Sequence, residues 1–112
     1  MGIRMFIVIN LRHEATHYWK DCNLSDVEYL KHPHRHEFHI TCKKVVDHKD
    51  RDIEFITMKQ NIQRWLKAVI GKQLHGLSCE ALGCLIMEKF KLSYVQVLED
   101  GENGAEIFST SK

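Results

Sequence analysis

Two long runs in which apolar and polar residues alternate constrain the fold of this chain more than any other feature. Over residues 5–17 and again over residues 34–46, every second side chain falls on one face of an extended strand. The apolar face of the first run comprises Ile7, Ile9, Leu11, His13, Ala15 and His17, and that of the second comprises His34, His36, Phe38 and Ile40. A period of two is typical of strands with one buried face. We therefore expect two long β-strands that carry histidines beside their apolar residues.

Shorter patterns predict the rest of the fold. Apolar residues recur at helical spacing from residue 52 to about residue 70, with Asp52 placed to cap this helix and Gly71 placed to end it. Ser78 can cap a second helix. The other predicted elements are a loop over 20–31 and strands over 94–98 and 105–109, joined by a turn at 100–104.

The order of these elements predicts the fold class. Strands and helices are segregated along the chain, which favours an α+β fold over alternating β-α units. We expect a four-stranded antiparallel sheet, in the order ββααββ along the chain, with both helices packed on one face. The chain of 112 residues leaves no room for a second core, so a single domain spanning residues 1–112 is predicted.

Composition excludes several classes of protein. The charged residues are mixed in sign and sum to a net charge of +1 at pH 7, whereas a nucleic-acid binder usually presents a strongly basic face. The apolar run at 5–11 is too short to span a bilayer and lacks the cleavage pattern of a signal peptide. We therefore expect a cytoplasmic protein that binds neither nucleic acid nor membrane.

Histidine, not cysteine, dominates the candidate metal ligands. The four cysteines, at positions 22, 42, 79 and 84, form no C-x-x-C pair, so neither a zinc ribbon nor a disulfide framework is indicated. Six of the eight histidines lie between residues 13 and 39. Histidine is the commonest metal ligand, so this cluster is the first candidate for a site.

Residues 13–17 read H-E-x-x-H, the zinc motif of a class of peptidases. That motif works on a helix, where both imidazoles point the same way and the glutamate is the general base. Here it continues a predicted strand with no cap before it. On a strand, Glu14 points to the face opposite His13 and His17. A peptidase is therefore the less favoured alternative.

A three-histidine site fits the strand pattern better. Alternation places His34 and His36 side by side at the start of the second long strand, and His17 at the end of the first. Their imidazoles can converge on one zinc ion and leave a position open for water or substrate. The other reading is half-exposed strand histidines without a ligand, but several imidazoles beside Phe38 and Ile40 without a partner would be unfavourable. We predict a Zn2+ site.

The order of five short motifs resembles the 6-pyruvoyl-tetrahydropterin synthase and 6-carboxytetrahydropterin synthase family. The family ends its first strand with x-A-A-H and opens its second with H-G-H-x-[FY]; the other three motifs are D-F-x-x-L-K, P-T-x-E-x-L and V-x-V-x-E-T. The matching segments here are residues 14–17, 34–38, 54–59, 78–82 and 95–99. They span most of the chain in the same order, and the H-x-H with an upstream histidine is the most specific of them.

The resemblance implies a T-fold, in which subunits join edge to edge as trimers or hexamers and ligands bind between subunits. It also implies that His17, His34 and His36 are the zinc ligands. Glu99 would anchor a pterin or purine by accepting two parallel N–H bonds, a strong charge-assisted pair. Without the family, Glu99 would be read as an ordinary turn acid.

The chain also departs from the family. The cysteine that the family places just before H-x-H is absent, and Cys22 lies well upstream in the same predicted loop. The family's Asp–His pair has no clear counterpart, and His75 is the one candidate remnant. Arg35 replaces the glycine between the zinc histidines; we expect it to bind an anionic ligand group or to pair with Glu37 or Asp52.

Two functions follow from these residues, besides the peptidase. The first is a zinc-dependent synthase or lyase that acts on a pterin-type substrate, with His75 or Cys22 moving the proton. The second is a non-catalytic T-fold protein that binds or sequesters a pterin, purine or nucleotide. Both require the three-histidine site, and both are expected to be homo-oligomers.

Overall fold

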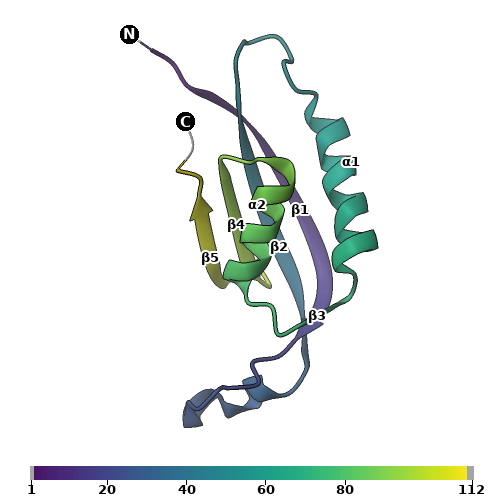
Figure 1. Ribbon diagram of the computed structural model, residues 1–112, viewed down its shortest axis with the longest axis vertical. Helices are drawn as coiled ribbons and strands as arrows, with labels where there is room; N and C mark the ends of the chain where they lie inside the picture. Colours follow the sequence, from purple (N-terminus) through teal and green to yellow (C-terminus); the bar gives the residue numbers. More distant parts are fainter. Residues whose placement is uncertain (1, 111–112) are drawn as a thin grey trace.

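Two antiparallel strands of 13 residues each, β1 (Met5–His17) and β2 (His34–Val46), form the long central part of the sheet (Figure 1). This computed structural model describes residues 2–110. The strands pair without interruption from one end, where Met5 faces Val46, to the other, where His17 faces His34. Both strands have the bounds that the alternation predicts.

Three shorter strands complete a five-stranded sheet in the order β3-β1-β2-β4-β5. The strand β4 (Tyr94–Glu99) pairs antiparallel with β2, and β5 (Asn103–Phe108) pairs antiparallel with β4. The strand β3 (Gln73–His75) pairs parallel with the end of β1. The predicted α+β class is confirmed, but the sheet is mixed and five-stranded, not four-stranded and antiparallel. A strand of three residues is too short to leave a periodic signal, so β3 could not be found from the sequence.

The helix α1 (Phe55–Trp65) continues as a π-helical turn, η2 (Leu66–Ile70), to Gly71. Gly71 has a φ of 72°, a left-handed value that glycine adopts without strain, so the predicted helix end is confirmed.

The predicted cap of α1 is wrong by two residues. Glu54, not Asp52, precedes the helix, and its carboxylate accepts hydrogen bonds from the backbone N–H groups of Ile56 and Thr57. Asp52 instead accepts from the backbone N–H of Asp47, at 2.7 Å, and so closes the loop after β2. An aspartate can satisfy either kind of backbone donor, and its sequence position does not decide between them.

The helix α2 (Cys79–Phe90) begins after Ser78, whose hydroxyl accepts from the N–H of Ala81 as predicted. A Cβ on Gly83 would lie only 2.2 Å from the Ile107 side chain, so the glycine lets α2 lie close over β4 and β5. The segment predicted as loop over 20–31 contains a short 3-10 helix, η1 (Ser25–Lys31), which projects beyond the end of the sheet (Figure 1).

One core joins both helices to the same face of the sheet, which we call the helix-covered face. Its fully buried members include Phe38 and Ile40 of β2, Ile62 of α1 and Leu82 of α2. The opposite face, the open face, carries the alternate residues of β1 and β2, such as Arg12, Glu14, Arg35, Glu37 and His39. No helix within residues 2–110 is both long enough and apolar enough to cross a membrane.

Candidate metal centre

Strand pairing brings three histidines and a glutamate to one end of the helix-covered face. His17 is the last residue of β1, and it pairs directly with His34, the first residue of β2. His36 follows two residues later on the same face. Glu99 ends β4 and pairs with Phe38, the next residue of β2 on that face. The three predicted metal ligands and the predicted ligand-binding Glu99 are thus brought together.

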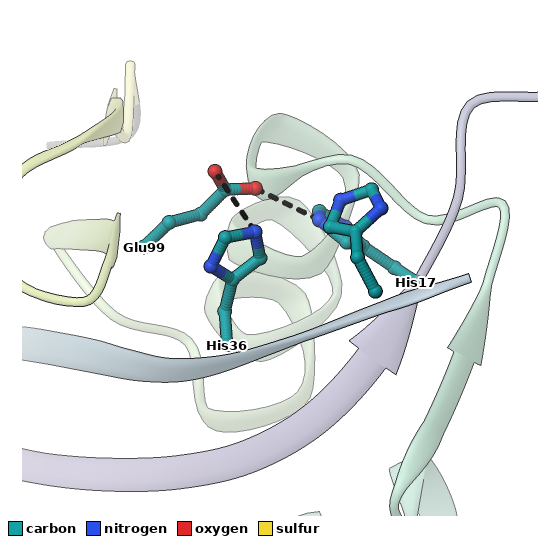
Figure 2. Close-up of side chains that lie close together, drawn as sticks. His17, His36 and Glu99 are labelled. Carbon is teal, nitrogen blue, oxygen red and sulfur yellow. Dashed lines mark ion pairs between the residues drawn. The ribbon is translucent and has the colours of Figure 1, made fainter. Parts of the chain in front are cut away.

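The donor atoms are close enough to share one ion. His17, His34, His36 and Glu99 each offer one ligand atom, and these four atoms lie within 4.8 Å of one another. The Glu99 carboxylate lies between two of the rings, with Oε2 2.8 Å from His17 Nε2 and Oε1 3.6 Å from His36 Nε2 (Figure 2). Two donors on one tetrahedral zinc ion lie roughly 3.3 Å apart, given bonds of about 2.0–2.1 Å. The observed separations bracket that value, so this group could hold a metal ion.

Each imidazole is oriented through its Nδ1 atom. The three Nδ1 atoms contact oxygen acceptors: His17 contacts Leu77 O at 3.0 Å, His34 contacts His32 O at 2.8 Å, and His36 contacts Asp100 Oδ2 at 2.6 Å. A carbonyl oxygen only accepts, so in the neutral rings Nδ1 carries the proton and Nε2 presents a lone pair. Ring orientation by a second acceptor is the usual arrangement around metal-ligating histidines.

His17 is the histidine with an unsatisfied buried atom. The residue is only 8% exposed, and among residues 2–110 its Nε2 has no aligned hydrogen-bond partner. When the His17 ring is neutral with its proton on Nδ1, the 2.8 Å contact with Glu99 Oε2 places two lone-pair-bearing atoms face to face. An unpaired buried polar atom is unfavourable, and a cation between the two acceptors would turn this repulsion into two bonds.

Asp100 was predicted only as a turn residue, but in the structure it contacts and orients His36. Its Oδ2 faces His36 Nδ1, and its Oδ1 accepts from the backbone N–H of Glu37 at 2.9 Å. That backbone hydrogen bond, followed by the one with His36, lowers the pKa of the Asp100 carboxyl below its ordinary value. Asp100 and Gly101 both have positive φ, at 55° and 75°. An Asp-Gly pair between two strands is a turn signal, but it does not reveal the histidine that the aspartate meets.

Arg35 does not reach the site. It projects from the open face, where its guanidinium pairs with Glu14 at 2.7 Å. It therefore pairs with neither Glu37 nor Asp52, the partners considered from the sequence. Alternation along β2 puts Arg35 on the face opposite His34 and His36, which is the physical reason.

The two predicted proton-transfer residues also lie outside the cavity next to the histidines. Cys22 is buried, and its thiol contacts the Val27 carbonyl within the segment that contains η1. His75 is exposed in β3 and does not line that cavity. Their backbones lie next to residues that line the cavity: the carbonyl of His75 accepts from the N–H of Tyr18, and the N–H of Cys22 donates to the carbonyl of Trp19.

The H-E-x-x-H residues do not form a peptidase site. They lie on β1, as the strand pattern predicts, so Glu14 is on the open face while His13 and His17 are on the helix-covered face. His13 Nε2 lies 2.6 Å from the carbonyl oxygen of Gly71, at the end of the first helix. That contact ties β1 to the segment leading into β3. Alternation along β1 keeps Glu14 on the face opposite the three clustered histidines.

A cavity of about 500 Å3 opens beside the histidines. His17, His34 and Glu99 line one side, and Tyr18, Trp19 and Leu30 line another. This volume is within the range of small-molecule sites, roughly 300–1,000 Å3.

Cys79, at the start of α2, also lines the cavity. Burial, with smaller contributions from the charges of Glu99 and Glu80, raises the pKa of its thiol to about 12. From the sequence, Cys79 was predicted to be one of the four cysteines outside any C-x-x-C pair and a member of the motif at residues 78–82, without a role in a site. Its position beside the site follows from the packing of α2 on the sheet.

Comparisons with known proteins show the fold alone. No family model matches the chain, and no curated protein matches it. The chain resembles the crystal structure of the uncharacterized protein WS1659 from Wolinella succinogenes, with a TM-score of 0.61 and 10% sequence identity over 96% of this chain and 99% of that one.

Proposed function

We propose that this protein is a zinc-dependent, synthase-like protein that acts on a pterin-type ligand. The supporting observation is the cluster of His17, His34 and His36, in which every Nδ1 has an oxygen acceptor and one ring nitrogen of each lies within 4.8 Å of the others. Three neutral imidazoles with a neighbouring open position are the donor set of catalytic zinc sites.

Glu99 has two roles in this proposal. Without a ligand in the cavity, its carboxylate is a fourth donor beside His17 and His36. With a ligand bound, it would instead accept two N–H bonds from the edge of a pterin ring, as the resemblance to the 6-pyruvoyl-tetrahydropterin synthase family implies. Zinc bound to the histidines would polarise a carbonyl or hydroxyl oxygen of the ligand.

The same resemblance implies a T-fold and a homo-oligomer, either a trimer or a hexamer. The antiparallel pairing of β1, β2, β4 and β5, with two helices on one face, is compatible with this assembly. Within residues 2–110, no strand pairs with the outer edge of β1 along its middle, since β3 pairs only with the last residues of β1. Such an edge is a place where a second subunit can add a strand.

A second candidate is a non-catalytic protein that binds a pterin, purine or nucleotide. The observation in its favour is that neither Cys22 nor His75 lines the cavity. A synthase needs a group that moves a proton within hydrogen-bond reach of the substrate. The two candidates share the metal centre and differ only in turnover.

Native mass spectrometry of the protein as purified tests the shared part. We expect one zinc ion per chain, a subunit number of three or six, and a bound small molecule. Protein that remains without metal after zinc is supplied would overturn the metal centre and both candidate functions with it.

Turnover separates the two candidates. Wild type, Cys22→Ala and His75→Ala are each loaded with zinc and incubated with a reduced pterin that carries a hydroxylated side chain. A changed pterin from wild type supports the synthase, and loss of turnover in one variant would identify that residue as the one that moves the proton. Unmodified pterin recovered from all three supports the binding protein.

A further inference from the structure

A second cavity lies between the start of α1 and the end of α2, far from the metal centre. Its volume is about 450 Å3, and it shares no lining residue with the cavity beside the histidines. The helix α1 runs toward β3 and α2 runs away from it, so these two helix ends are neighbours (Figure 1). Lys44 of β2 lines this cavity, and along the strand it lies roughly 27 Å from His36, given about 3.4 Å per residue.

The lining of this second cavity is basic, and we call it the lysine-lined cavity. Three lysines, Lys44, Lys89 and Lys91, line it with one acid, Glu54, which leaves a formal charge of +2. None of the three lysines forms an ion pair with a carboxylate among residues 2–110. The Glu54 carboxylate already accepts hydrogen bonds from the N–H groups that begin α1. The ammonium groups are therefore available to an anion that enters the cavity.

Lys44 is only partly exposed, and its charge is not balanced by a carboxylate. Its Nζ donates to the backbone carbonyl of Phe90 at 2.8 Å. An ammonium group has three N–H donors, so this contact leaves two of them free for another acceptor. Partial burial disfavours an uncompensated charge, and an anion in the cavity would supply the missing counter-charge.

Lys91 ends α2 in a backbone conformation that usually belongs to glycine. Its φ and ψ are both 52°, in the left-handed region, where a side chain is unfavourable. The helix dipole favours a cation anywhere in the last turn, so it does not account for a lysine at this residue. Nor do free carbonyls oppose an anion here, because Met87 O accepts from the N–H of Leu92 and Phe90 O accepts from Lys44. Contact between the Lys91 ammonium and an anion gives this substitution for glycine a reason.

The rest of the lining includes an apolar surface. Ile53, Met58 and Phe90 line the cavity beside the lysines, and its volume lies within the range of small-molecule sites, roughly 300–1,000 Å3. Lysines bind phosphate groups as point charges. A single inorganic phosphate would leave the apolar surface unused, whereas a ligand with two phosphate groups and an apolar body would match both the formal charge and the apolar lining.

We propose that the lysine-lined cavity binds an organic diphosphate, with the diphosphate group on Lys44, Lys89 and Lys91 and the apolar body against Ile53 and Met58. The site is separate from the metal centre, and it does not depend on the function proposed for that centre. Its failure and the failure of the metal centre are therefore observed in different experiments.

Calorimetric titration with two probes tests the site. Inorganic diphosphate and geranyl diphosphate are titrated into wild type, Lys89→Gln, Lys91→Gly and the control Lys67→Gln. Lys67 is exposed in η2 and does not line the cavity, so its variant controls for the loss of one positive charge. We expect Lys89→Gln and Lys91→Gly each to weaken binding of both probes about fivefold, as expected for one charge at close range in water, and Lys67→Gln to bind like wild type. Geranyl diphosphate should bind at least about tenfold more tightly than inorganic diphosphate, because its chain buries apolar surface.

Thermal melting of the Lys91→Gly protein separates loss of the charge from loss of the fold. Glycine adopts the left-handed conformation without strain, so this variant should melt about 3 °C above wild type while it binds diphosphate less tightly. A lysine with a purely structural role would show no loss of binding. Equal affinity of wild type and Lys91→Gly therefore removes Lys91 from the site.

The remaining outcomes also decide the proposal. Wild-type affinity in both lysine variants overturns the lysine-lined cavity as the binding site, and so does an absence of heat with both probes. His17→Ala is titrated in parallel, because a phosphate group can also bind to zinc. Diphosphate binding that is lost in His17→Ala and kept in the lysine variants would place the ligand at the metal centre. Equal affinity for the two probes would overturn the apolar part of the site.

Discussion

The two faces of the sheet carry ionisable side chains on the same strands, but these side chains have different kinds of partner on the two faces. On the open face Arg35 pairs with Glu14, and Glu37 contacts both Arg12 and His39, at 3.3 and 3.0 Å. The side chains of Arg12, Arg35 and Glu14 are more than half exposed to water, and those of Glu37 and His39 are partly exposed. Their pairs need no further partner, and exposed pairs of this kind contribute little to stability.

On the helix-covered face the same alternation leaves a cluster of acceptors. His17 is buried, its Nε2 has no aligned partner among the described residues, and the Glu99 carboxylate faces it. The Nδ1 atom of each clustered histidine contacts an oxygen acceptor that orients the ring, and for His36 this acceptor is Asp100. The contrast teaches that the number of histidines in a region is a poor indicator of a metal site. A better indicator is a group of ring nitrogens and carboxylate oxygens whose lone pairs converge on one point and have no other partner.

Removal of a ligand should have the largest effect. His17→Ala deletes one of three imidazole donors, so we expect zinc affinity to fall by more than about a hundredfold, beyond the roughly 10–100-fold effect of losing a second-shell partner. The matched control is His39→Ala on the open face, whose affinity should equal that of wild type. Competition against a chromophoric chelator measures both. Equal affinities of the two variants would remove the contrast between the faces.

Zinc should stabilise the fold by the next largest amount. A ligand present at about 100 times its dissociation constant adds roughly 2.7 kcal/mol, which raises the melting temperature of a domain of this size by about 10 °C. Differential scanning calorimetry with zinc and with a chelator measures the shift. His36→Ala should show no shift, and a shift in that variant equal to wild type would place the ion elsewhere.

Asp100→Asn should reduce zinc affinity by about 10–100-fold, because it removes the anionic acceptor that orients His36. Asparagine tolerates the left-handed backbone at this position, so the turn is retained. The control is Glu37→Gln, which breaks the pairs with Arg12 and His39 on the open face and leaves the metal site untouched. An Asp100→Asn protein that binds zinc like wild type would show that the contact is incidental.

Glu54 is a carboxylate away from the metal centre, and backbone N–H groups at the start of α1 already donate hydrogen bonds to it. Hydrogen bonds from the backbone of Ile56 and then Thr57 lower its pKa from 4.5, so it binds protons less readily in the folded chain than in the unfolded one. Its contribution is therefore present above about pH 4.5 and is lost as the pH falls through the lowered folded-state pKa. Glu54→Ala should melt below wild type at neutral pH, and the gap should close in acid. The difference in melting temperature between Glu54→Ala and wild type should be the same with and without zinc. For Asp100→Asn, this difference should depend on zinc.

The smallest effect is expected for the ion pair of Arg35 and Glu14. Both side chains are more than half exposed, so Arg35→Ala should change the free energy of unfolding by no more than about 0.5 kcal/mol. Zinc affinity should not change. Urea unfolding and the chelator assay measure the two quantities. A loss of zinc affinity would mean that Arg35 contributes to the site from the other face.

Most of the fold was accessible from local patterns. The alternation predicted both long strands with their observed bounds, and Ser78 and Gly71 marked helix ends correctly. Where several local solutions compete, the prediction failed: Asp52 closes a loop and Glu54 caps the helix. The parallel strand β3 exists only because the chain after Gly71 returns to β1, and no pattern over three residues signals this.

In the candidate site, too, local patterns predicted some residues correctly and others wrongly. Its three histidines follow from period-two alternation, because a strand presents every second side chain on one face whatever surrounds it. The residues that the sequence offered for catalysis and ligand charge, His75, Cys22 and Arg35, are not brought to the cavity.

By itself the sequence determined the phase of two long strands, and hence that His17, His34 and His36 lie beside apolar residues. The tertiary structure alone decided what surrounds them: Leu77 reaches His17 across 60 residues of chain, and Asp100 reaches His36 across 64. Such contacts depend on strand register and on the path of the connecting segments. These are set by the packing of the whole core, and no local pattern encodes them.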